Sequence, residues 1–312
     1  MNLDKNQKFK KILHYVLNGI ISTFMIAYFG FTILPVAILR KPIITLAKFI
    51  IELLSPVLEE AANPTYLYSP YAILCLLLLL MFFIIKPLRK YLKALGRSSK
   101  GNTSKMLLYG LLLGFIMNGL CIFIAYINGN IHLEYSQFEP IKLIIIFIFV
   151  FLQCAYEEII SRCFIYQRLK HTYNPTVAVI ASAIYFSLIH IFNSGISLLA
   201  IVSLTLVGIL YVLFVHYFDS IWISFGAHAA WNFTQNFLFG LPNSGVVSTY
   251  SVFKLINETT SGFAYDKVFG VEGSLFCTII YIIAIAVVIY YGNKHKVIPL
   301  DIFQDANKNN VE

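Results

Sequence analysis

Charged residues are scarce in this sequence. Asp, Glu, Lys and Arg make up 12% of the 312 residues, whereas hydrophobic residues make up 59%. A typical soluble domain has about 25% charged residues, so this composition excludes an ordinary soluble protein. The scarcity of charge leaves long uncharged runs, which are typical of an integral membrane protein built from helices.

The sequence also lacks the cysteine and histidine patterns of disulfide-rich and zinc-binding proteins. Its five cysteines show no paired spacing and no CxxC, and no HExxH is present. We therefore expect the cysteines to be small core residues, without a disulfide framework or a structural zinc site. The net charge of +8 does not indicate nucleic-acid binding, because the basic residues cluster beside the apolar runs, as in membrane proteins.

The apolar runs predict an all-α fold, a polytopic transmembrane helical bundle of about eight spans with a buried polar cavity. Each run is near or above the ~20 residues that a helix needs to cross a bilayer. With the N-terminus inside, most Lys and Arg residues fall on the inner side, so we expect a cell-membrane protein with both termini in the cytoplasm. The expected spans are 13–39, 65–85, 106–127, 143–166, 175–193, 197–218, 220–240 and 274–292.

The segment 41–60 allows two interpretations, because it carries charges among Ile, Leu and Val at helical spacing. It is either an amphipathic helix on the outer surface or a ninth span. We prefer the surface helix, since a ninth span would move the basic loop 86–105 outside. The chain then divides into N-terminal spans with a basic inner loop (1–135), a core with polar residues in its spans (136–240), and an outer loop, last span and cytoplasmic tail (241–312).

Two adjacent carboxylates interrupt the fourth expected span. Glu157 and Glu158 follow a long uncharged run, and Arg162 comes four residues after the second. Ionisable groups at membrane depth cost roughly 3 kcal/mol each on insertion scales and usually face the bundle interior. On a helix, Glu158 and Arg162 share a face, whereas Glu157 points about 100° further round. Glu157 is thus a candidate general base. The alternative, a structural salt bridge, explains the second Glu poorly.

Two further polar clusters occur on later spans. Phe186 lies one turn before His190, so it can shield the imidazole or shape a substrate groove; the alternative is ordinary packing around a core histidine. His228 and Asn232 lie on one helix face and can donate hydrogen bonds to an oxyanion, the alternative being helix–helix hydrogen bonding. Together, the carboxylates, imidazoles and amide can activate a water and stabilise a tetrahedral intermediate.

The order of these residues, EExxxR, then FxxxH, then HxxxN, resembles the CPBP family of intramembrane proteases, also called the Abi family. That family includes type II CAAX prenyl proteases and bacterial proteins linked to bacteriocin self-immunity or peptide maturation. The resemblance covers 140–240, about a third of the chain. It implies an all-helical membrane core whose buried cavity cleaves peptides, so the segment 136–240 is expected to be the catalytic core.

The resemblance also implies roles for the motif residues. Glu157 and His190 correspond to the pair that activates water, and His228 and Asn232 to the oxyanion site. Supporting roles fall to Glu158, Arg162 and Phe186. His190, His228 and a Glu can in principle ligate zinc. We favour a metal-free glutamate mechanism, with no cofactor.

The expected function is an intramembrane endopeptidase that acts in peptide maturation or bacteriocin immunity. Its expected partners are the lipid bilayer and a peptide or small membrane-protein substrate, with no nucleic acid. One alternative is a non-enzymatic immunity or scaffold protein on the same fold. A second is a proton-coupled transporter, because Glu, His and Arg within membranes also mark ion paths.

Overall fold

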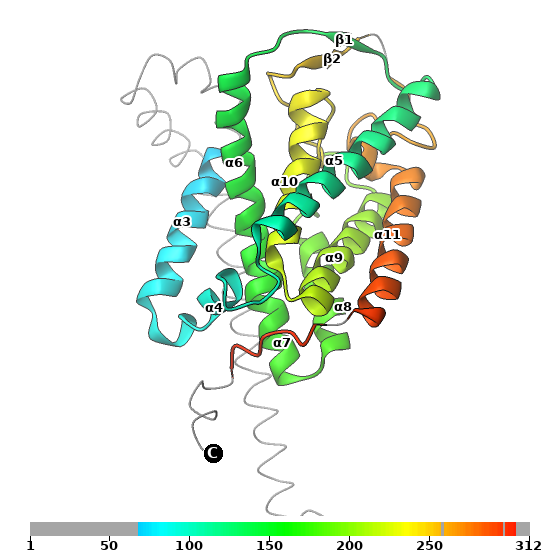
Figure 1. The fold of residues 1–312 in the computed structure, drawn as a ribbon. Helices are drawn as coiled ribbons and strands as arrows, with labels where there is room; N and C mark the ends of the chain where they lie inside the picture. Colours follow the sequence, from blue (N-terminus) through cyan, green and yellow to red (C-terminus); the bar gives the residue numbers. More distant parts are fainter. Residues whose placement is uncertain (1–67, 257–258, 296, 304–312) are drawn as a thin grey trace, which may run out of the picture.

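The computed structural model describes residues 68–256, 259–295 and 297–303. Within these ranges the chain is mainly helical, with one small sheet of two antiparallel strands, which confirms the all-α prediction (Figure 1). The expected span 13–39 and the segment 41–60 lie outside the described residues.

The elements of the described chain follow one another in a simple order. They are α3 (Ser69–Ile84), η1 (Lys86–Leu88), α4 (Tyr91–Leu95), α5 (Ser104–Ile127), β1 (Leu133–Tyr135), α6 (Pro140–Glu158), η2 (Ile159–Tyr166), α7 (Gln167–Thr172), α8 (Pro175–Leu188), α9 (Leu198–Phe218), α10 (Ile221–Phe233), η3 (Thr234–Leu238), β2 (Phe253–Leu255), η4 (Val271–Gly273) and α11 (Leu275–Lys294). Strands β1 and β2 lie at one end of the bundle, α4 and α7 lie at the other, and α6 runs between these ends (Figure 1).

Four helical stretches of the described chain are long and apolar enough to cross a membrane. They are α5, the continuous stretch 140–172 that contains α6, η2 and α7, then α9 and α11. A fifth arises if α3 and the η1–α4 segment, bent by 105°, count as one broken span. These helices support the prediction of a multi-pass membrane protein. The expected number of about eight spans is not confirmed.

The expected spans 175–193 and 220–240 contain shorter helices. α8 has 14 residues and α10 has 13. α8 ends at Leu188 and leads into a turn, and α10 continues into the π-helix η3. Irregular backbone at membrane depth is tolerated where protein covers it or where it lines a cavity. Both of these helix ends lie beside the cavity described below.

Small residues set the position of α10 against α5. A Cβ on Gly110 would lie 2.2 Å from the backbone oxygen of Ile223, and a Cβ on Gly114 would lie 2.1 Å from that of Ala227. Two glycines four residues apart therefore allow the two backbones to touch, as small residues do in membrane helix pairs. This close contact fixes the position and rotation of α10, and His228 lies on this helix one residue after Ala227.

Polar side chains fix where several helices begin. The side-chain oxygens of Thr103, Asn174, Ser197 and Ser274 each accept a hydrogen bond from the backbone N–H three residues later. Such caps satisfy amide groups that the first helical turn leaves without partners. They define the starts of α5, α8, α9 and α11.

π-helical turns coincide with the end of one motif and follow another, because η2 contains Arg162 and η3 comes after Asn232. η2 begins directly after Glu158, and η3 begins two residues after Asn232. The hydroxyl of Ser182 on α8 donates to the backbone oxygen of Ser161 in η2 at 2.7 Å, which ties this turn to the neighbouring helix. π-turns inside α-helices are rare and often occur at functional sites.

Candidate active site

Glu158 forms a fully buried ion pair with Arg162. Its Oε1 accepts from Nη1 of Arg162 at 3.0 Å, and both side chains are fully buried. The same oxygen lies 3.0 Å from Nδ1 of His228 on α10. Nη2 of Arg162 donates to the backbone oxygen of Gly208 on α9 at 3.1 Å. The predicted pairing of Glu158 with Arg162 is therefore confirmed, and it also joins α6 to α9 and α10.

Aromatic rings enclose this ion pair. The guanidinium carbon of Arg162 lies 4.3 Å from the ring centroid of Phe186 and 5.5 Å from that of Tyr211. The ring of His228 lies 5.7 Å from Phe186 and 5.6 Å from Tyr211. Phe186 thus packs on both the cation and the imidazole. Tyr211, on α9, belongs to none of the three motifs, so the sequence analysis did not identify it.

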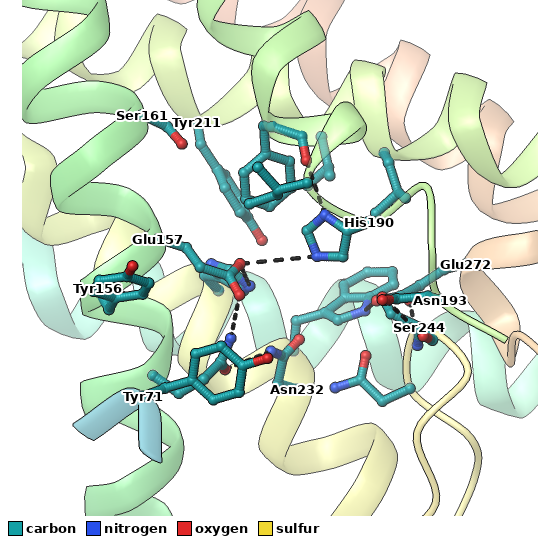
Figure 2. Close-up of a pocket in the computed structure, with 18 of the residues that line it drawn as sticks. Tyr71, Tyr156, Glu157, Ser161, His190, Asn193, Tyr211, Asn232, Ser244 and Glu272 are labelled. Atoms are coloured by element: carbon teal, nitrogen blue, oxygen red, sulfur yellow. Dashed lines mark hydrogen bonds and ion pairs between the residues drawn. The ribbon is translucent and has the colours of Figure 1, made fainter. Parts of the chain in front are cut away.

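Glu157 approaches both imidazoles, whereas Glu158 contacts only that of His228 among the two. Its Oε2 lies 3.9 Å from Nε2 of His190 and 3.9 Å from Nε2 of His228. This oxygen is buried and has no hydrogen-bond partner. Its other oxygen, Oε1, accepts from Nε2 of Gln153 at 2.5 Å. Figure 2 shows Glu157 and His190 pointing toward each other.

His190 lies in a turn just beyond the end of α8. Its Nδ1 is 2.8 Å from the backbone oxygen of Phe186, and its ring packs on the Phe186 ring at 5.1 Å. Because a carbonyl oxygen only accepts, Nδ1 carries the proton in this contact, and in the neutral ring Nε2 is then an acceptor. That acceptor is the atom that faces Glu157.

Asn232 is connected to Glu157 by Gln153, a residue that the sequence analysis did not identify. Its Nδ2 lies 3.3 Å from Oε1 of Gln153 and 3.4 Å from Sγ of Cys154. Gln153 therefore contacts both Glu157 and Asn232. The sequence did contain a signal for Gln153. It is a polar residue in an otherwise apolar run, and it lies one helical turn before Glu157 on the same helix face.

One cavity of about 420 Å³ is lined by residues of all three motifs, although Glu158 and Arg162 do not line it. Tyr and Phe side chains make up much of its wall, which is typical of a ligand pocket with a few convergent polar groups. In the part of the chain that the structure describes, no group of three or more His, Cys, Asp or Glu residues is placed to hold a metal ion. The predicted catalytic residues that line the cavity are Glu157, His190, His228 and Asn232.

Comparison with known proteins gives a match to a protein family. Residues 139–234 match the family model described as Type II CAAX prenyl endopeptidase Rce1-like. This segment is CAAX-protease-like. It contains every motif residue named above, and the match is consistent with the CPBP family that the three motifs indicate. No curated protein and no solved structure matches the chain significantly. Since the matched family is a protease family, the finding supports an enzyme.

A further buried carboxylate, that of Glu272, lies outside the CAAX-protease-like segment. Oε1 of Glu272, in η4, accepts from Nε1 of Trp231 at 2.9 Å, and its Oε2 accepts from Oγ of Ser244 at 2.6 Å. Burial raises the pKa of Glu272, and the hydrogen bonds from Ser244 and Trp231 oppose this rise. Glu272 and Ser244 line the same cavity as Glu157, but no spacing in the sequence connects them to it.

Proposed function

We propose that the chain is an intramembrane endopeptidase in which Glu157 and His190 activate a water molecule. One observation carries this proposal: Oε2 of Glu157 lacks a hydrogen bond and lies 3.9 Å from Nε2 of both histidines. This separation is too long for direct hydrogen bonds and suits an oxygen atom bridging the groups. A water there meets a candidate base, as general base catalysis requires.

In the proposed reaction, the water donates one hydrogen bond to Nε2 of His190 and transfers its other proton to Oε2 of Glu157. The water oxygen forms a bond to the carbonyl carbon of the substrate peptide. When the C–N bond of the tetrahedral intermediate breaks, the proton held by Glu157 passes to the leaving amine. The products are a new carboxyl terminus and a new amino terminus, and Glu157 returns to its starting state.

His228 and Asn232 are assigned to the oxyanion of that intermediate. In its imidazolium form, His228 donates from Nδ1 to Glu158 and keeps an Nε2–H for the substrate. The amide nitrogen of Asn232 contacts two neutral acceptors, Oε1 of Gln153 at 3.3 Å and Sγ of Cys154 at 3.4 Å. A developing negative charge is a stronger acceptor than either partner, so the amide can turn toward it.

A metal-free reaction is part of this proposal. Tetrahedral zinc holds its ligands at about 2.0–2.2 Å, which brings ligand atoms on neighbouring side chains to about 3.4 Å from one another. The Glu157 oxygen is 3.9 Å from each Nε2. We therefore assign water activation to the side chains alone.

The proposed substrate is a peptide or a small membrane protein, cleaved in peptide maturation or bacteriocin immunity. The protease family match over the motif-bearing segment supports peptide-bond cleavage as the reaction. We place the protein in the cell membrane with both termini in the cytoplasm, because the basic residues of the chain then lie on the inner side.

Comparative peptidomics tests the proposed function. Cells that make the wild-type chain are compared with cells that make Glu157→Ala, at matched membrane expression. We expect defined peptides to disappear and their uncleaved precursors to accumulate in the variant. Glu134→Ala is the matched control, because Glu134 lies on β1 with its side chain 58% exposed. Unchanged peptidomes, together with intact immunity in the Glu157→Ala strain, would favour the non-enzymatic scaffold instead.

A further inference from the structure

Glu272 is a buried acid with a complete set of donors. Its Oε1 accepts from the indole N–H of Trp231 at 2.9 Å. Its Oε2 accepts from the backbone N–H and the hydroxyl of Ser244 at 2.8 and 2.6 Å. A buried carboxylate is costly unless donors satisfy it, so this arrangement is a specific tie between α10 and the loop that follows η3. Figure 2 shows Glu272 and Ser244 across the cavity from Glu157.

The loop held by Glu272 is in an unusual backbone conformation and packs tightly. Ser244 has a φ of 48°, in the left-handed region that non-glycine residues seldom adopt. At Gly245, with a φ of 81°, an added Cβ would lie 2.2 Å from the backbone oxygen of Ser194. The loop is therefore pressed directly against the turn that follows α8.

That turn carries His190. Nδ2 of Asn193 donates to the backbone oxygen of Ser244 at 2.9 Å, and the backbone N–H of Asn193 donates to the oxygen of His190 at 2.9 Å. His190 lies beyond α8, so the regular hydrogen bonds of that helix do not fix its position. Its backbone is held by short-range turn contacts and, through Asn193, by the Ser244 loop.

We propose that Glu272 is a positioning residue that holds the His190 turn at its working distance from Glu157, acting through Ser244 and Asn193. Through Trp231 the tie ends on α10, the helix that carries His228 and Asn232. The catalytic consequence rests on the proposed function, whereas the tie itself is a property of the fold. Glu272 and Ser244 lie beyond the CAAX-protease-like segment 139–234, so the C-terminal part of the chain completes the site.

Hydrogen exchange measured by mass spectrometry tests the tie without reference to catalysis. The variant Glu272→Gln places an NH₂ group among three donors, so at least one hydrogen bond must break. We expect amide exchange in residues 189–197 and 242–246 to rise about tenfold, with no change in 153–162. Glu134→Gln is the control. Unchanged exchange in 189–197 would overturn the proposal.

Kinetics test the positioning role. With a peptide identified by the peptidome comparison, we expect kcat of Glu272→Gln to fall about 10- to 100-fold while KM changes less than about twofold, because a misplaced group chiefly affects the transition state. Ser244→Ala removes only the hydroxyl and should have a smaller effect in the same direction. Ser248→Ala, whose hydroxyl contacts only its own loop at Tyr250, is the matched control. A rise in KM at constant kcat would overturn the positioning role.

The two experiments separate this proposal from the proposed function. If exchange in 189–197 rises in Glu272→Gln but the wild-type protein cleaves no peptide, the tie stands and the protease assignment fails. If the wild-type protein is active and Glu272→Gln loses kcat without any change in exchange, the protease assignment stands and the tie fails.

Discussion

The cavity has two walls of different construction. The motif wall presents Glu157 on α6 and His228 and Asn232 on α10 to the cavity, and the fully buried Glu158–Arg162 pair lies behind it, so its groups are mounted on helices. The loop wall consists of Asn193, Ser244 and Glu272, which lie in a turn, a loop and a short 3-10 helix. The motif wall fixes its groups by spacing along helices, whereas the loop wall depends on hydrogen bonds between segments 28 and 51 residues apart.

The two walls differ in how firmly their groups are held in place. The motif wall buries a charged pair completely, so losing one partner leaves an uncompensated charge. The loop wall has fewer helical restraints, and segments of this kind open locally at lower free energy than core helices. We therefore expect damage to the motif wall to unfold the protein or to stop its chemistry, and damage to the loop wall to reduce the rate only.

The largest effect is expected from Arg162→Met. It removes the arginine partner of Glu158, leaves His228 as the remaining partner of this buried carboxylate, and should lower the free energy of unfolding by about 3–5 kcal/mol. Thermal unfolding in detergent measures this loss, with the exposed Arg97→Met as the control. The double variant Glu158→Leu/Arg162→Met removes both charges and should recover much of the stability. A double variant as unstable as Arg162→Met would contradict the buried-pair account.

Asn232→Ala tests the chemistry of the motif wall with little damage to the fold. It removes two long contacts worth about 1 kcal/mol in total, but it also removes an oxyanion donor. We expect kcat to fall by about 10²- to 10³-fold with nearly unchanged thermal stability. The matched control is Asn128→Ala at the exposed end of α5. An unchanged kcat would remove Asn232 from the oxyanion site.

The smallest effect is expected from a chelator. If side chains alone organise both walls, a metal chelator should leave the peptide cleavage rate within about twofold of the untreated enzyme, because no bound ion lowers the pKa of the attacking water. The measurement is cleavage by the purified wild-type protein before and after chelation. Loss of activity that zinc restores would contradict the metal-free mechanism and would assign the histidines to a metal site.

Much of the motif wall could be predicted from the sequence because its contacts follow helical spacing. Glu158 and Arg162 are four residues apart, and the structure pairs them at 3.0 Å. The same spacing links His190 to the backbone oxygen of Phe186 at 2.8 Å. The long apolar runs also predict the all-helical fold, since backbone groups in lipid must be satisfied within the segment.

The loop wall and the ends of two expected spans could not be predicted in this way. No local pattern indicates that Glu272 meets Ser244, because a single sequence carries no signal for contacts between distant loops. Hydrophobic runs mark apolar stretches but not where a helix stops. The runs near His190 and Asn232 were therefore expected to be whole spans, whereas α8 ends at Leu188 and α10 continues into the π-helix η3.

A double-mutant cycle on Glu157 and His190 tests the central claim most directly. The cleavage rates of Glu157→Gln, His190→Gln and the double variant are measured with the purified protein in liposomes, with His132→Gln as an exposed control. If both groups act on one water, each single change lowers kcat about 10²- to 10⁴-fold and the double change costs little more than the worse single change. Losses that simply multiply, or single variants with full activity, would contradict the shared water.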